Sequence, residues 1–355
     1  GWKDEWDAWL EPNATAFDAN DPDLQAFLRR HEPTLRLLHA AAGKSGCYFD
    51  HDYANPSIEV LCPEFWQFRR AGKVLALAAR SKAARGDFRG GLRDVNTMFA
   101  FAEHAGNGPF LISVLVAIGT DAMAAETLQS VLDTGRATAE DLAALHIEES
   151  LSYRRLFDRS LRMEEAFRLS SFASIGGGRA SDPRAWDIIG LTPSFHPFYR
   201  VFLMRDDLAA HYRLSEKYRK LAALPYYQAR DRWRDLDTEL RIGPIAILTN
   251  MLMPALNAAS ERVAEGDARR RVTRTALAAL RYRARHGRLP ERLEDLVGEF
   301  LTVVPLDPFS GKPLRWKRTD AGAIVYSIGQ NAVDDGGAPL DRRKKTGDVS
   351  FRVPG

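Results

Sequence analysis

Apolar positions recur every three to four residues over most of the first two thirds of the chain, which predicts amphipathic helices. Asp21-Pro22 supplies a cap and first-turn signal, and Leu24, Phe27 and Leu35 fall on one face, so we expect a helix over 22–43. Further helices, separated by glycine-containing breaks, are predicted over Phe65–Arg85, Asp87–Ala105, Pro109–Thr134 and Ala139–Ala173.

The break at Gly86-Asp87 is typical of a tight turn between two antiparallel helices. Helices paired in this way favour a helical-hairpin or solenoid-like region, although no regular repeat runs along the chain. Residues 174–198 are rich in Gly and Pro and predict an irregular connection. Helices resume over Phe198–Ala222 and Tyr226–Leu240. We therefore divide the chain into a helical domain, 1–240, and a C-terminal module, 241–355.

The C-terminal module changes from helical to strand-like patterning. A helix with a bend at Pro254 is expected to end at His286, where Gly287 suits a left-handed C-cap. A turn at Thr319–Gly322 separates two short apolar runs and predicts a hairpin. Strands are predicted over Leu314–Lys317, Ile324–Ser327 and Asp348–Val353. The expected fold class is mainly α with a C-terminal α+β module, in which a long helix lies beside a small antiparallel sheet.

Several short motifs of this module occur in a recognisable order. They are Tyr282-x3-His286-Gly287-x-Leu289-Pro290, Asp307-Pro308, Gly311-Lys312-Pro313, Tyr326-Ser327-Ile328-Gly329 and an acidic loop with Gly336-Gly337. In this order they resemble the globular domain of the major pseudopilin of type II secretion. The resemblance covers about the last quarter of the chain and implies a pilin-like helix laid across a small antiparallel sheet.

The whole chain also resembles uncharacterised bacterial cell-envelope proteins that join a helical N-terminal region to this ending. That resemblance implies an extracytoplasmic, periplasmic location, protein partners in the envelope, and a membrane anchor ahead of Gly1. A pseudopilin begins with the hydrophobic half of its first helix, whereas here a long helical region precedes the module. We therefore do not expect this chain to polymerise as a pilin.

In pseudopilins the acidic loop binds calcium, and the resemblance carries that expectation to Asn331, Asp334, Asp335 and Asp348. Calcium takes six to eight oxygen ligands, and a tight loop can offer carboxylates, amide oxygens and backbone carbonyls together. The alternative is a turn that uses Asn, Asp and Gly only for backbone geometry. Asn331 stands where pseudopilins usually carry an Asp, which weakens the expected affinity.

The chain has two cysteines, Cys47 and Cys62, on either side of a turn-rich stretch. Sequence alone leaves a disulfide and two buried thiols equally open. The resemblance to envelope proteins favours the disulfide, because such bonds persist in oxidising compartments.

Net charge is +3, too balanced to indicate a nucleic-acid partner. The basic runs Arg269-Arg270-Arg271 and Arg342-Arg343-Lys344-Lys345 are interpreted as solvated surface. No apolar run reaches the length expected for a membrane span, and no signal peptide is visible after Gly1.

A search for catalytic motifs finds none. No His-Glu-x-x-His or Gly-x-Ser-x-Gly occurs, and no two histidines share a helix face at ligand spacing. The leading hypothesis is a non-catalytic interaction or scaffold protein of the envelope, associated with a secretion or pilus-like assembly. The alternative is a hydrolase-type enzyme with its site in the cleft between the helical region and the module. Convergent polar groups with perturbed pKa values in the deepest pocket would favour the enzyme.

Overall fold

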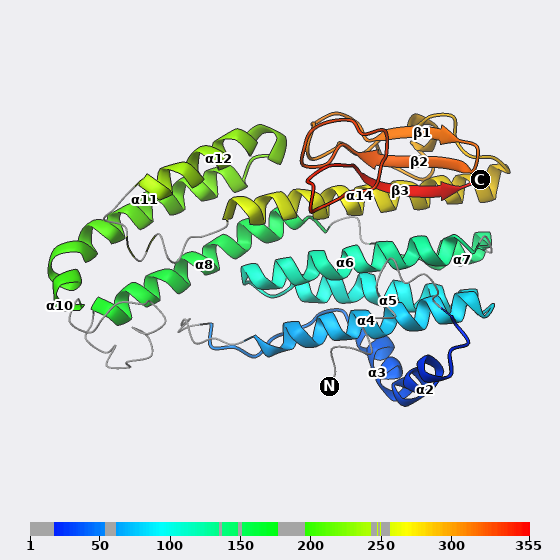
Figure 1. Ribbon diagram of the computed structural model, residues 1–355, viewed down its shortest axis with the longest axis horizontal. Coiled ribbons are helices and arrows are strands. Elements are labelled where there is room, and N and C mark those ends of the chain that lie inside the picture. The colour runs from blue at the N-terminus through cyan, green and yellow to red at the C-terminus, as the bar shows by residue number, and fades with distance from the viewer. Residues whose placement is uncertain are drawn as a thin grey trace.

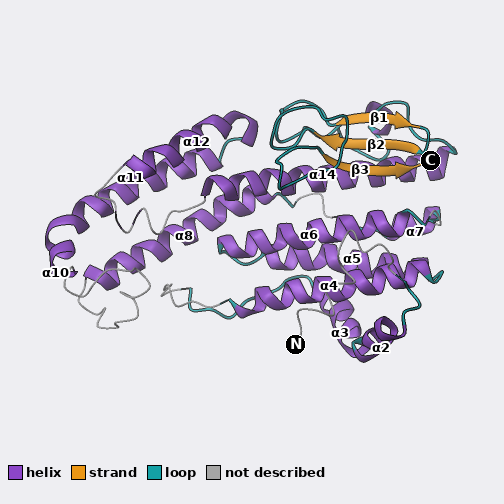
Figure 2. Ribbon diagram, in the orientation of Figure 1, coloured by secondary structure: helices purple, strands orange, loops and turns teal. Residues whose placement is uncertain are grey.

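The computed structural model describes residues 18–53, 62–134, 137–147, 151–176, 196–242, 247, 249 and 256–355. Long helices run along the longest axis of the molecule, and a small sheet lies over one end of α14 (Figure 1). The chain is mainly helical with a three-stranded antiparallel sheet near its C-terminus, as the sequence predicted (Figure 2).

The first described helices are α2, Pro22–Arg30, and α3, Glu32–Ala42. The single helix predicted over 22–43 is therefore wrong, because the chain breaks at His31 (φ −93°, ψ 2°). Pro33 lies in the first turn of α3, where its missing N–H does no harm; within a continuous helix it would remove a hydrogen bond and clash with the preceding turn.

The next helices are α4, Pro63–Ala84, α5, Phe88–Gly106, and α6, Leu111–Leu132, and they pack against one another close to the predicted ranges. Gly86 makes the turn between α4 and α5 with φ 95°, a left-handed conformation that glycine adopts without strain. Asp87 caps α5 by accepting a hydrogen bond from Gly90 N at 2.9 Å.

Helix α6 is long and apolar enough to cross a membrane, with a mean hydropathy of 1.6 over its most apolar window. The expectation that no segment reaches this length is therefore wrong for α6. However, 61% of that window is buried inside the protein, as in the core helix of a bundle. Length and composition alone are weak grounds for a membrane span.

The helix predicted over Ala139–Ala173 is two helices. Helix α7, Ala139–Ala144, starts with a capping box between Thr138 and Asp141 and ends where Leu145 is extended. Helix α8, Tyr153–Gly176, starts afresh, because Asp267 accepts hydrogen bonds from the backbone N–H of Tyr153 (2.8 Å) and Arg154 (3.3 Å).

The rest of the helical region consists of α10, His196–Phe198, a π-helical turn η1, Tyr199–Leu203, α11, Met204–Ala222, and α12, Tyr226–Ile242. The predicted helices over Phe198–Ala222 and Tyr226–Leu240 are confirmed. Most of the predicted irregular connection, 177–195, lies outside the described residues, as does the predicted bend at Pro254.

The C-terminal elements are α14, Leu256–His286, a 3₁₀ turn η2, Leu293–Leu296, and strands β1, Arg315–Thr319, β2, Gly322–Ser327, and β3, Val349–Pro354. Gly287 follows α14 with φ 73°, as predicted. The strands form an antiparallel meander in the order β1-β2-β3. Val325 in the central strand lies opposite Trp316 in β1 and Phe351 in β3.

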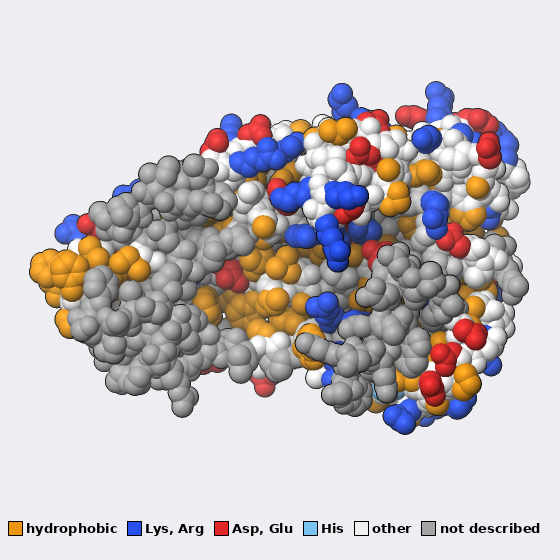
Figure 3. Space-filling view, in the orientation of Figure 1, with side chains coloured by type: hydrophobic (Ala, Val, Ile, Leu, Met, Phe, Trp, Pro, Cys, Tyr) orange, Lys and Arg blue, Asp and Glu red, His pale blue; other side chains and the backbone are white. Residues whose placement is uncertain are grey.

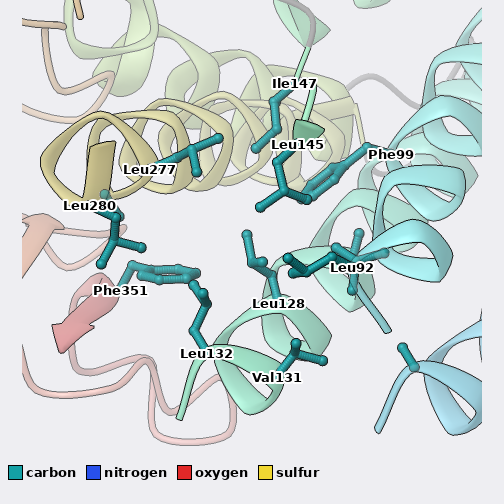
Figure 4. Close-up of a cluster of buried hydrophobic side chains, with 14 of the residues drawn as sticks. Leu92, Phe99, Leu128, Val131, Leu132, Leu145, Ile147, Leu277, Leu280 and Phe351 are labelled. Carbon is teal, nitrogen blue, oxygen red and sulfur yellow. The ribbon is translucent and has the colours of Figure 1, made fainter. Parts of the chain in front are cut away.

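One buried apolar cluster joins the sheet to the helical region (Figure 4). Phe351 of β3 lies beside Leu280 of α14 and Leu132 of α6. An ion pair strengthens this contact, since Arg352 Nη2 lies 2.6 Å from Asp133 Oδ2 at the end of α6. The sheet is thus fixed on the helices, and the core crosses the predicted boundary near residue 240. The boundary itself stays a prediction.

A second contact corrects the interpretation of Arg269-Arg270-Arg271. Arg270 in α14 is only 3% exposed and donates to Asp121 of α6 and Glu103 of α5, each at 2.6 Å. Its two neighbours are engaged as well: Arg269 pairs with Glu265 at 3.3 Å, and Arg271 donates to the carbonyl of Leu306 at 2.6 Å. The run is therefore part of the packing between α14 and its surroundings.

Candidate functional site

The acidic loop lies between β2 and β3, and Asp348 comes just before β3, as the resemblance implied. The Asp348 side chain is buried and accepts hydrogen bonds from Gly337 N at 2.7 Å and Asp335 N at 3.4 Å. Burial raises the pKa of Asp348, and the charges of Asp335 and Asp334 raise it further. The two backbone hydrogen bonds act in the opposite direction.

The other predicted ligands are engaged within the same loop. Asp335 Oδ2 accepts from Gly347 N and from Asn331 Nδ2, both at 2.8 Å. Asp334 accepts from Gly336 N at 3.0 Å, and its other oxygen lies 3.2 Å from Arg315 Nε. These acids therefore close the loop by accepting backbone N–H bonds, which is the role expected of Asp and Asn in turns.

The loop fits a calcium ion only in part. It crowds negative charge around the buried Asp348, which a cation would relieve. Against this, Arg315 already supplies a positive charge to Asp334. Within the described part of the chain, Asp334, Asp335 and Asp348 do not form a group of ligand atoms all within 4.8 Å of one another. Calcium binding at Asn331, Asp334, Asp335 and Asp348 stays a prediction.

Calcium is expected to raise the melting temperature of the protein, and Asp335→Ala is expected to abolish that rise. Sites of the weak extracellular class bind with Kd of about 10⁻⁴ to 10⁻³ M, so roughly 10 mM Ca²⁺ would add about 1.4 to 2.7 kcal/mol. The measurement is thermal unfolding with Ca²⁺, with Mg²⁺ and with neither ion. Asp320→Ala, in the β1–β2 turn, is the matched control and should keep the response. An unchanged melting temperature at millimolar Ca²⁺ would rule the site out.

A cavity of about 180 Å³ lies where the enzyme alternative placed its cleft, between the helices and the module. It is bounded by α8, the end of α11, α12, α14 and the turn at 306–308, and its lining is mostly apolar, including Phe157, Leu221, Trp233 and Val263. Burial raises the pKa of Asp267, the carboxyl group on its α14 side. A perturbed carboxyl group in a pocket is the signal that would favour catalysis.

The charged groups of this cavity are, however, bonded to backbone atoms. Asp267 caps α8. Asp307 accepts from Phe309 N at 2.8 Å and from Ile328 N at 3.1 Å, which joins its turn to the end of β2. Arg154 donates to the carbonyl of Ala223 at 2.7 Å, and Arg271 donates to Leu306. Each of these charged side chains is therefore engaged in holding parts of the fold together.

The two cysteines lie in the helical region, far along the chain from the acidic loop. Both are free thiols in the structure and partly buried. The Cys47–Cys62 disulfide is thus not formed there and stays a prediction. Cys62 lies beside His51 and Glu64, and the sequence search missed this group because its members come from different segments.

Comparisons with known proteins identify no relative. No protein-family model matches the chain, and no match is found among the curated proteins or the solved structures.

Proposed function

We propose that this protein is a non-catalytic interaction or scaffold protein of the bacterial cell envelope, with a pseudopilin-like module at its C-terminal end. Its partners would be envelope proteins of a secretion or pilus-like assembly. Its location would be extracytoplasmic, and an N-terminal anchor outside this chain would hold it near the membrane.

The order of elements in the module is the observation that carries this proposal. A long helix ends at a left-handed glycine, Gly287, and a short helical turn follows. Three antiparallel strands then cover the helix, and an acidic loop closes the last pair. The pseudopilin resemblance implied this arrangement. An all-helical segment or a parallel sheet would have removed its basis.

The way the module is fixed supports a scaffold more than a polymerising subunit. Phe351 and Arg352 anchor β3 to α6, and Arg342 of the later loop pairs with Glu265 of α14 at 2.5 Å. These contacts leave the sheet in one position relative to the helical region. The charged side chains of the 180 Å³ cavity hydrogen-bond to backbone atoms, and this favours a scaffold over the hydrolase alternative.

An apolar tip offers a surface on which to test the proposal. Phe198, Val201 and Phe202 share one helical face at α10 and η1, where hydrophobic side chains gather at one end of the molecule (Figure 3). Val201 is 72% exposed and Phe202 is 65% exposed. Clustered exposed apolar side chains are typical of protein-interaction surfaces.

The experiment places a photo-crosslinking residue at Phe202 in cells and identifies the captured envelope proteins by mass spectrometry. We expect a specific set that disappears when Phe198 and Val201 are replaced by Ser. Leu37→Ser with Tyr48→Ser, a pair on another surface that is 71% and 76% exposed, is the control and should not change the set. Fractionation of the protein with cytoplasmic markers, or capture that the control pair removes equally, would contradict the proposal.

A further inference from the structure

A mixed group of nitrogen, sulfur and oxygen ligands lies at the start of α4. One ligand atom from each of His51, Cys62 and Glu64 lies within 4.8 Å of the other two. All three residues are partly buried. Among the residues that the structure describes, this is the one group of His, Cys and acidic side chains with such spacing.

The fold brings these side chains together from two segments. Cys62 is the residue before α4 and Glu64 lies in its first turn, so both are set by the start of one helix. His51 comes from an irregular segment earlier in the chain, and its Nε2 lies 2.7 Å from Glu64 Oε1. This contact already places one imidazole nitrogen beside one carboxylate oxygen.

Aromatic side chains hold the imidazole in place. The His51 ring packs edge-on against Tyr53 at 5.8 Å and against Phe110 at 5.9 Å between centroids. The Tyr53 hydroxyl donates to the carbonyl of Phe49 at 2.7 Å, which closes the segment on itself. Phe49 packs in turn on Phe65 of α4 at 5.3 Å. The His51 ring therefore has little freedom to leave Glu64.

A second carboxylate, Glu164, lies near the same group. Its Oε1 accepts a hydrogen bond from Leu111 N at 3.1 Å, at the start of α6, and its Oε2 lies 4.0 Å from Arg168 Nη1. Glu64 and Glu164 are both close enough to the Cys62 thiol to interact with it electrostatically. Zinc binding at Cys62 would release the thiol proton, because the metal ligand is the thiolate.

We propose that His51 Nε2, Cys62 Sγ and a Glu64 carboxylate oxygen bind one zinc ion. Imidazole, thiolate and carboxylate are the ligand types that zinc takes, and three protein ligands leave a fourth position for water. Tetrahedral bonds of about 2.0–2.3 Å place ligand atoms roughly 3.3–3.8 Å apart. The 2.7 Å contact between His51 and Glu64 would have to lengthen by about 1 Å or less.

Zinc binding and the predicted disulfide exclude each other, because Cys62 cannot serve both. The site therefore requires reduced Cys62, and a Cys47–Cys62 bond would remove it. Without a metal, the His51–Glu64 contact would serve only to hold the irregular segment around His51 on α4. The test must separate a metal site from that structural contact.

The test adds Co²⁺ to the reduced full chain and follows the near-ultraviolet thiolate-to-cobalt absorption, then displaces the cobalt with Zn²⁺. We expect a band that saturates at one equivalent and disappears with zinc. Cys62→Ser should remove the band, while His51→Ala and Glu64→Gln should each weaken binding by more than about tenfold, the lower limit seen even for outer partners of ligands. Cys47→Ser is the matched control and should leave both band and affinity unchanged.

Circular dichroism of each variant at the titration temperature separates lost binding from lost folding. A folded wild-type chain that shows no thiolate band with Co²⁺ would overturn the site. The same conclusion follows if Cys47→Ser removes the band as fully as Cys62→Ser, or if folded His51→Ala and Glu64→Gln variants bind with wild-type affinity.

Discussion

Replacing Arg270 with methionine is expected to lower the free energy of unfolding by about 3–5 kcal/mol. Arg270 is 3% exposed and Asp121 is 1% exposed, so the variant would leave the Asp121 carboxylate buried without its partner. Burial raises the pKa of Asp121, and the charge of Arg270 and its 2.6 Å hydrogen bond act against this rise. Breaking a buried pair from one side is costly because the remaining charge keeps its desolvation penalty.

Chemical denaturation at neutral pH measures this loss. Arg318→Met, on the exposed strand β1, is the matched control and should change stability by less than about 0.5 kcal/mol. Adding Asp121→Leu to Arg270→Met should recover much of the loss, because replacing both partners by apolar residues is often neutral. A single Arg270→Met variant as stable as the Arg318→Met control would show that Arg270 and Asp121 do not form a buried ion pair in solution.

The two partners of Arg270 explain why the charge pattern led to a wrong interpretation of the Arg269-Arg270-Arg271 run. Asp121 is 149 positions away and Glu103 is 167 positions away, so neither appears in the local pattern. A charge run within a helix favours solvent exposure unless such partners are known. Burial of a charge is decided by tertiary contacts, and periodicity carries no information about them.

The periodicity of apolar positions predicts that the helices exist. The residue at which a helix starts depends on contacts that are local for some helices and distant in sequence for others. The α4–α5 break was predicted because Gly86 and Asp87 carry the turn chemistry themselves. The start of α8 was missed because its cap, Asp267, comes from another helix. The sheet was predicted, like the α4–α5 break, because the signals of the hairpin at Thr319–Gly322 are local in the sequence.

The candidate sites show the same difference between signals that are local in the sequence and contacts that are not. The four predicted calcium ligands gather in one loop because three of them are close in sequence, and the strand pairing brings Asp348 back to them. His51, Cys62 and Glu64 do not share the spacing of one helix face, because His51 lies on an irregular segment 13 residues before Glu64. A search that required both ligands on one helix could not find it.

Acidification is expected to destabilise the protein by about 2–3 kcal/mol between pH 7 and pH 4.5 through His211 alone. His211 in α11 is buried, its ring lies 5.5 Å from Phe172, and no described residue hydrogen-bonds to its Nδ1. Burial, with the nearby charge of Arg168, lowers the pKa of His211 to about 4, from an ordinary value of 6.5.

The sign follows from proton uptake. Below pH 6.5 the unfolded chain binds a proton at His211 that the folded chain does not bind until about pH 4. The contribution of His211 to stability is therefore complete above pH 6.5 and is lost as the pH falls towards 4. Each unit of difference in pKa corresponds to about 1.4 kcal/mol.

Carboxyl groups also titrate in this range, so the informative quantity is the difference between wild type and His211→Gln. Unfolding by denaturant at several pH values should give a wild-type stability that falls towards pH 4.5 more steeply than that of His211→Gln, by about 2–3 kcal/mol in total. His286→Gln, at the exposed C-terminal end of α14, should keep the wild-type slope. Equal slopes for wild type and His211→Gln would mean that His211 is hydrated and ordinarily basic in the folded protein.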